Sequence, residues 1–266
     1  MDFWELEEGT SQFSPPTIPL PTPHCFNMEE LPTASSARTQ TSEILALLST
    51  NKPLSQPQLE FSSTPLYTHL SLGLALTTGS ALGRCKPPTP SQCLSAFQLP
   101  NKVGLTAGAR AWTKHAHRSQ EYHPSAVSKK DKGEPGWWGR AQGPRDFLNE
   151  GAYQLFCKIM QEASWKNLHA LPHNILAYEM RVPEGYGMRW SQDRGPPKEK
   201  DRITAVEGED QNIVPERPWI FRGFVEPMIE NGHELGWRHD SRVPRVSAEE
   251  QGDLKPNLPP DVSGDS

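Results

Sequence analysis

The sequence predicts an α+β fold in which one amphipathic helix lies on a small antiparallel sheet, with a long disordered N-terminal region and a disordered tail. The first observation is composition: 35% of the 266 residues are hydrophobic and 27 are Pro. Such a chain buries too little apolar surface to offset the entropy of ordering. The second observation is a helix-periodic stretch that begins at Asp146, and the third is a pair of aromatic, glycine-containing runs after it. We therefore expect a folded unit over residues 146–240, between a mostly disordered region 1–145 and a disordered tail 241–266.

The N-terminal region contains two segments suited to binding a partner. The run Pro15-Pro-Thr-Ile-Pro-Leu-Pro-Thr-Pro23 favours an extended polyproline II conformation. Residues 41–49 place Ile44, Leu47 and Leu48 on one helical face, within a box of sequence ILALL. This box is either an anchor for an apolar groove or a transient turn of helix in a disordered chain.

A basic, aromatic segment occupies residues 102–145, with nine Lys and Arg against three Asp and Glu. The cations could neutralise phosphates while aromatic rings stack on unpaired bases. The rings belong to Trp112, Tyr122, Trp137 and Trp138. Because these residues show no core periodicity, the other interpretation is a solvated basic linker. His115 and His117 lack an evident third ligand and therefore predict no metal site.

The folded unit begins with a predicted helix over residues 146–163. Apolar side chains recur there at three- and four-residue steps from Leu148 to Ala163, which gives one broad apolar face. Gly151 weakens its first turn. Ser164 is placed to cap a further short helix, residues 165–171.

Two strands complete the unit. Alternation of apolar and polar residues predicts one strand over residues 174–182 and a second over residues 218–225, which could pair with the first. Between them we expect a turn at residues 185–190 and a charged loop at residues 191–216. Glycines mark further turns over residues 231–239.

Any specific function is predicted to lie on an aromatic turn made from the ends of the two strands. Its residue types are those enriched at binding hot spots, and neighbouring glycines would expose them. The candidate binding residues are Tyr186, Arg189, Trp190, Trp237, Arg238 and His239. The other interpretation is that Trp190 and Trp237 close the core.

Catalytic or metal chemistry has one candidate location, at the C-terminal end of the folded unit. His239 follows His233 by six residues, whereas the zinc-protease helix needs a spacing of four. A site that joins His233 and Glu234 to Glu226 would depend on how the turns fold. We therefore assign no catalytic residue, no metal ligand and no cofactor, and the sequence leans away from an enzyme.

Three blocks of the C-terminal part resemble the signature of a small eukaryotic protein family of unknown function. The blocks are Tyr186–Trp190, Phe221–Pro227 and Gly232–His239. The resemblance spans about residues 146–240. It implies a small folded unit with an aromatic-rich end and supplies no activity.

These observations predict a non-catalytic, intracellular protein-interaction protein, cytoplasmic or nuclear, with another protein as its partner. The acidic N-terminus does not resemble a targeting segment, and no apolar run is long enough to cross a bilayer, so we expect no membrane partner. The alternative is a nucleic-acid-associated or transcription-linked protein that uses the basic segment and the ILALL box. A third reading is a small metal-dependent enzyme. Oligomeric state is not predicted.

Overall fold

The structure is a computed structural model that describes residues 20–83, 85–119, 136–195 and 217–228. The helices within these ranges are α1 (Ala34–Ser49), α2 (Gln56–Ser62), α3 (Pro65–Ser71), α4 (Pro90–Gln98), α5 (Ala107–His115) and α6 (Arg145–Glu162). The strands are β1 (Trp165–Leu171), β2 (Ile175–Arg181), β3 (Gly187–Asp193) and β4 (Ile220–Val225). Short 3-10 turns follow α5 (η1, Ala116–Ser119) and β1 (η2, Pro172–Asn174).

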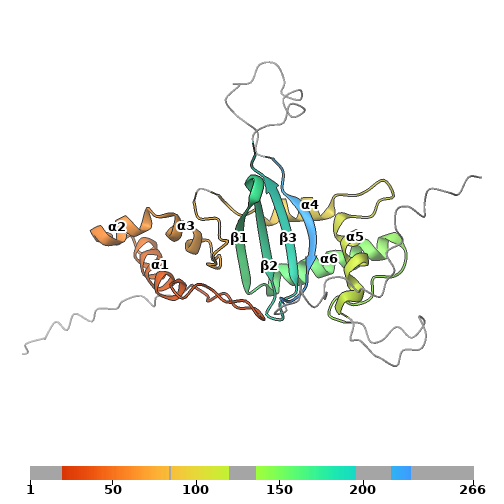
Figure 1. Ribbon diagram of the computed structural model, residues 1–266, viewed down its shortest axis with the longest axis horizontal. Coiled ribbons are helices and arrows are strands. Elements are labelled where there is room, and N and C mark those ends of the chain that lie inside the picture. Colours follow the sequence, from red (N-terminus) through yellow and green to blue (C-terminus); the bar gives the residue numbers. More distant parts are fainter. Residues whose placement is uncertain (1–19, 84, 120–135, 196–216, 229–266) are drawn as a thin grey trace, which may run out of the picture. The chain divides into compact units, whose positions relative to one another are not determined.

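The four strands form one antiparallel sheet in which their order follows the chain (Figure 1). Directly opposed residues share a face, because side chains alternate along each strand. On one face, which we call the core face, Leu168, Tyr178 and Trp190 are opposed. On the other, the outer face, Asn167 of β1 opposes Glu179 of β2, which opposes Arg189 of β3.

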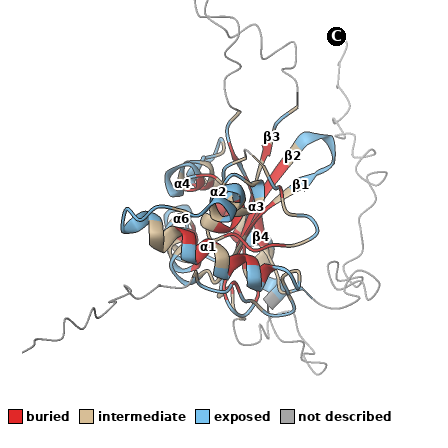
Figure 2. Cartoon of the chain, turned by 90° about the vertical axis from the view of Figure 1, so that its left-hand side faces the viewer, coloured by how far each residue is buried: buried red, intermediate tan, exposed pale blue. Residues whose placement is uncertain are grey.

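Side chains from α4, α5 and α6 pack on the core face and make the main hydrophobic core. The ring of Phe97 in α4 lies 4.9 Å from that of Phe156 in α6 and 4.8 Å from that of Phe221 in β4. Gly151 allows the close approach of α5 to α6, since a Cβ at this position would lie 2.6 Å from the Trp112 ring. Figure 2 shows the resulting concentration of buried residues along the sheet.

The N-terminal helices pack in a smaller cluster and also reach the sheet. Ala34, Ala37, Leu70 and Leu76 form this cluster between α1 and α3. Residues 75–81 extend the β1 edge, with backbone hydrogen bonds from Ala75 to Lys166 (2.6 Å) and from Ala81 to Leu168 (2.7 Å).

Residues 24–26 hydrogen-bond to residues next to the start of β1 and the end of β2. The His24 amide donates to the Ser164 carbonyl, and the Phe26 amide donates to the Pro183 carbonyl at 2.8 Å. Trp165 and Arg181 lie on the outer face at this end and are 0% and 2% exposed. One end of the outer face is therefore buried.

The predicted α+β class is confirmed, with α6 close to the expected helix and β2 and β4 close to the expected strands. Two local predictions are wrong. Residues 165–171 form β1 rather than a helix, and residues 187–193 form β3 where a turn was expected, so β3 separates the two predicted strands. The reason is burial: Trp165 and Asn167 on the outer face and Leu168 on the core face are all buried, so this part of β1 lacks the apolar–polar alternation that marks a half-buried strand.

The folded unit also extends further toward the N-terminus than residue 146. Residues 34–115 contribute five helices, and Phe97 and Trp112 belong to the core of the sheet. Described residues of the basic segment are part of this core as well. Trp138 is 1% exposed, and its carbonyl accepts a 2.7 Å hydrogen bond from Trp112 Nε1. The predicted tail, residues 241–266, lies outside the described residues, as do residues 229–240.

Candidate functional site

The outer face carries a groove of about 420 Å³, which we call the arginine groove. Apolar side chains of the β1–β2 hairpin line one part of it, and residues of β3 and β4, both polar and apolar, line the rest. Its lining includes Leu171, Ile175, Ala177, Arg189, Ser191 and Arg222. Both arginines are exposed, so the groove combines an apolar wall with two cations that solvent can reach.

A β-bulge places the second arginine in the groove. Arg189 opposes Gly223, while its neighbour Trp190 opposes Phe221, so Arg222 is an extra residue in β4. Bulges interrupt the ladder and change the direction of a side chain. Gly223 has a φ of 129°, a backbone conformation that glycine accepts most readily.

Glu179 holds the first arginine in place. Arg189 Nε donates to Glu179 Oε2 at 2.6 Å, and Arg181 Nε donates to Oε1 at 2.6 Å. The Glu179 side chain is only 3% exposed, whereas that of Arg189 is 44% exposed. Burial alone would raise the pKa of Glu179, but the two guanidinium charges outweigh burial and lower it. The carboxylate is therefore ionised and presents Arg189 to the groove.

A histidine–carboxylate pair lies at the β4 edge of the sheet. His115, the last residue of α5, is 2.5 Å from Glu226 Oε1 through its Nδ1. The side chains are 15% and 12% exposed. Burial would raise the pKa of Glu226, but the hydrogen bond and charge of His115, together with Arg118, lower it. Since an ionised carboxylate only accepts hydrogen bonds, Nδ1 carries the proton of this contact.

The other ring nitrogen of His115 lies near a residue that lines the groove. Nε2 lies 3.8 Å from the position that a Cβ would take at Gly223, a residue that lines the arginine groove. Arg181 links this pair to the Glu179 site, because its Nη1 donates to the Glu226 carbonyl at 2.7 Å. The histidine pair and the groove are therefore connected through the side chain of Arg181.

The structure separates the predicted binding residues. Arg189 lies in the arginine groove. Trp190 is 0% exposed on the core face and donates from Nε1 to the Cys93 carbonyl at 3.1 Å. Tyr186 is half-buried and stacks on Trp137 with ring centroids 4.7 Å apart. Trp237, Arg238 and His239 lie outside the described residues.

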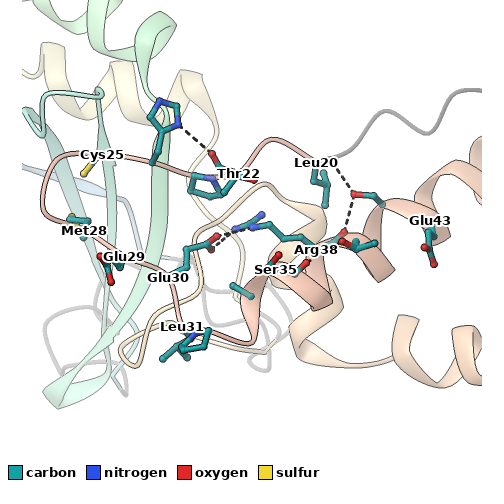
Figure 3. Close-up of a pocket in the computed structure, with 16 residues that line it drawn as sticks. Leu20, Thr22, Cys25, Met28, Glu29, Glu30, Leu31, Ser35, Arg38 and Glu43 are labelled. Atoms are coloured by element: carbon teal, nitrogen blue, oxygen red, sulfur yellow. Dashed lines mark hydrogen bonds and ion pairs between the residues drawn. The ribbon is translucent and has the colours of Figure 1, made fainter.

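A larger cavity, of about 730 Å³, lies between residues 20–32 and α1. Figure 3 shows Arg38 directed toward Glu30 in its wall, and Arg38 Nε donates to Glu30 Oε2 at 3.0 Å. Glu29 and Glu43 also line this cavity. Its single arginine is paired with a carboxylate, so the cavity is less suited to an anion than the arginine groove.

One comparison with known proteins covers β1, β2 and β3. Residues 122–195 match the family model of the CdiA C-terminal tRNase toxin domain. The match covers a little over a quarter of the chain, and its described part runs from residue 136 through α6, β1, β2 and β3. No curated protein and no solved structure matches the chain.

This tRNase match corrects three expectations. The resemblance to a eukaryotic family of unknown function is wrong, because the family that matches is a tRNase toxin domain. The prediction of a non-catalytic protein-interaction protein is contradicted for the same reason, as is its description as an uncharacterised, protein-binding chain. The nucleic-acid alternative agrees better with the match, although the ILALL box does not form a free apolar face. Ile44 is 0% exposed within the fold, whereas Leu48 is 48% exposed.

Two further observations concern the described residues alone. Within them, no helix is long and apolar enough to span a membrane. No group of three His, Cys, Asp or Glu side chains in these ranges could hold a metal ion.

Sequence reasoning missed the residues that surround the groove. In the sequence, Arg222 looked like an ordinary polar position of a strand. Only the bulge in β4 shows that it lines the groove. His115 and Glu226 are 111 residues apart in the chain. No local pattern connects them, and Glu179 and Arg181 show only as alternating charges within a strand, whereas Arg189 was among the predicted binding residues.

Proposed function

We propose that this protein is a ribonuclease that acts on tRNA, and that the arginine groove holds the phosphodiester backbone at the cleavage site. The observation that supports this most directly is the tRNase match over residues 122–195. Its described part includes β1, β2 and β3, which carry Leu171, Ile175 and Arg189 of the groove.

The chemistry of the groove suits a nucleotide. Guanidinium groups bind phosphate oxygens through paired hydrogen bonds and keep their charge at all physiological pH values. Arg189 and Arg222 supply two such groups. The apolar side chains of Leu171 and Ile175 line the same groove and offer a surface for the planar face of a base.

The same two cations favour cleavage as well as binding. When the ribose 2′-hydroxyl attacks the adjacent phosphorus, negative charge grows on the phosphate oxygens in the transition state. Fixed cations lower the energy of such a state because they are already oriented toward the charge. Glu179 contributes this orientation for Arg189, since it holds the guanidinium by its Nε.

Incubation of the purified full-length chain with a tRNA pool tests the proposal, with fragments resolved on a denaturing gel. We expect discrete tRNA fragments that end in a 2′,3′-cyclic phosphate. Arg222→Glu should abolish cleavage, because it reverses one charge of the groove at an exposed position. Arg110→Ala, an exposed arginine on α5 away from the groove, is the matched control and should cut at the wild-type rate.

Binding measurements separate recognition from chemistry. If Arg222 contacts a phosphate, Arg222→Ala should weaken tRNA binding and reduce the slope of log affinity against log salt concentration by about 1. Intact tRNA after incubation with excess wild-type protein would overturn the proposal. Cleavage of tRNA by Arg222→Glu at the wild-type rate would also overturn the proposal.

The remaining expectations stay predictions. A tRNA-acting enzyme would meet its substrate in the cytoplasm or the nucleus, the locations expected from the sequence. A protein partner would bind in addition to the nucleic acid.

A further inference from the structure

His115 and Glu226 form a proton-transfer device beside the arginine groove. The contact from Nδ1 to Glu226 Oε1 is 2.5 Å, and both side chains are mostly buried. A carboxylate in this position fixes the orientation of an imidazole ring and stabilises the charge of its doubly protonated form. The pair is thus built to keep Nε2 in one place.

Contacts from two arginines hold Glu226 in position. Its carbonyl accepts a hydrogen bond from Arg181 at 2.7 Å, and its carboxylate receives a second, longer contact of 3.3 Å from Arg118. Arg181 is itself 2% exposed and bound to Glu179. A ligand that binds Arg189 in the groove would therefore contact a side chain that is connected to Glu226 through Glu179 and Arg181.

The approach to Nε2 is through Gly223. No described residue hydrogen-bonds to this nitrogen, and Gly223 belongs to the bulge that also carries Arg222. A side chain at residue 223 would lie within 3.8 Å of Nε2, so the glycine leaves that space to a ligand.

We propose that His115 is a catalytic residue of the ribonuclease, acting as the general acid that protonates the leaving 5′-oxygen, with Glu226 as its positioning residue. This inference rests on the proposed function. The 2′-oxygen forms a bond to phosphorus while the bond from phosphorus to the 5′-oxygen breaks. The proton of the 2′-hydroxyl passes to water, and the proton on Nε2 passes to the 5′-oxygen. The ring then takes a proton from water.

The test compares two substrates that differ in one atom. The cut site in tRNA is first mapped with the wild-type chain, and a tRNA is then assembled with sulfur in place of the 5′-oxygen at that bond. A thiolate leaves without protonation, so loss of a general acid slows only the oxygen substrate. We expect His115→Ala to slow cleavage of the oxygen substrate by about 10²–10⁴-fold and to cut the sulfur substrate at nearly the wild-type rate.

Three further variants complete the experiment. His115→Asn keeps an amide donor near Glu226 and should behave like His115→Ala, which covers the case in which the alanine variant does not fold. Glu226→Gln should give a smaller loss in kcat with little change in KM. His117→Ala, an exposed histidine two residues further on, is the matched control and should leave both rates unchanged.

The outcomes distinguish this inference from the proposed function. If the wild type cuts no tRNA, the proposed function fails and the inference fails with it. If the wild type and His115→Asn cut the oxygen substrate equally fast, the ribonuclease stands and His115 is not its acid. If both His115 variants are slow on both substrates, with tRNA affinity unchanged, His115 has another role and the inference is overturned.

Discussion

At the scale of single residues, Glu179 determines what the outer face can do. Its carboxylate is 3% exposed and accepts hydrogen bonds from Arg181 and Arg189. A buried charge is tolerated only when it is paired and fully hydrogen-bonded. Glu179 meets this condition, so one buried carboxylate serves both the stability of the sheet and the position of Arg189.

Replacing Glu179 with Ala should therefore lower the free energy of unfolding by about 3–5 kcal/mol, the usual cost of breaking a buried ion pair. Urea denaturation followed by circular dichroism measures this change. Glu162→Ala, at an exposed position of α6, should stay within about 0.5 kcal/mol of the wild type.

The pH dependence of stability gives a second measure of the same group. Because the folded state lowers the pKa of Glu179 below the ordinary 4.5, its contribution is fully present above that value and is lost as the pH falls through the folded pKa. The wild type should therefore lose more stability between pH 6 and acidic pH than Glu179→Gln. Equal losses would contradict the role of this carboxylate.

At the scale of secondary-structure elements, α5 joins the core to the candidate site. Its Trp112 is 5% exposed in the core, and its last residue, His115, lies at the β4 edge. The helix was expected to belong to a basic segment that either binds nucleic acid or forms a solvated linker. Its aromatic and small residues instead pack against α6, because Gly151 lets the Trp112 ring approach that helix.

Trp112→Ala should consequently destabilise the protein by about 3–5 kcal/mol, since it removes a large buried ring and its hydrogen bond to the Trp138 carbonyl. Lys114→Ala, an exposed change on the same helix, is the control and should have an effect of at most about 0.5 kcal/mol. Thermal unfolding of both variants measures the difference. An unchanged midpoint for Trp112→Ala would show that α5 does not belong to the core.

At the scale of the whole molecule, the sheet depends on helices from the N-terminal half of the chain. The core face carries aromatic residues such as Trp190 and Phe221, and α4 and α5 cover them with Phe97 and Trp112. An isolated sheet with one helix would expose these rings to water, at a cost of about 25 cal/mol for each Å² of apolar surface.

A fragment of residues 146–240 should accordingly not unfold cooperatively, whereas a fragment of residues 20–240 should. Differential scanning calorimetry and the dispersion of amide resonances distinguish the two results. A cooperative transition in the short fragment, at the temperature found for the long one, would show that α4 and α5 are not needed for the fold.

The sequence by itself determined the fold class, the long helix and two of the four strands, because α6, β2 and β4 carry clear local periodicity. It also identified Arg189 as a candidate binding residue. Only the tertiary structure decided that residues 165–171 are a strand, because Trp165 and Leu168 are buried on opposite faces and no alternating pattern marks this part of the chain. It alone brought His115 to Glu226 and placed Arg222 in the groove, since these positions depend on a contact across 111 residues and on a one-residue bulge. Neither the contact nor the bulge can be recognised in the local sequence, because both depend on which elements pair and not on which residues are adjacent in the chain.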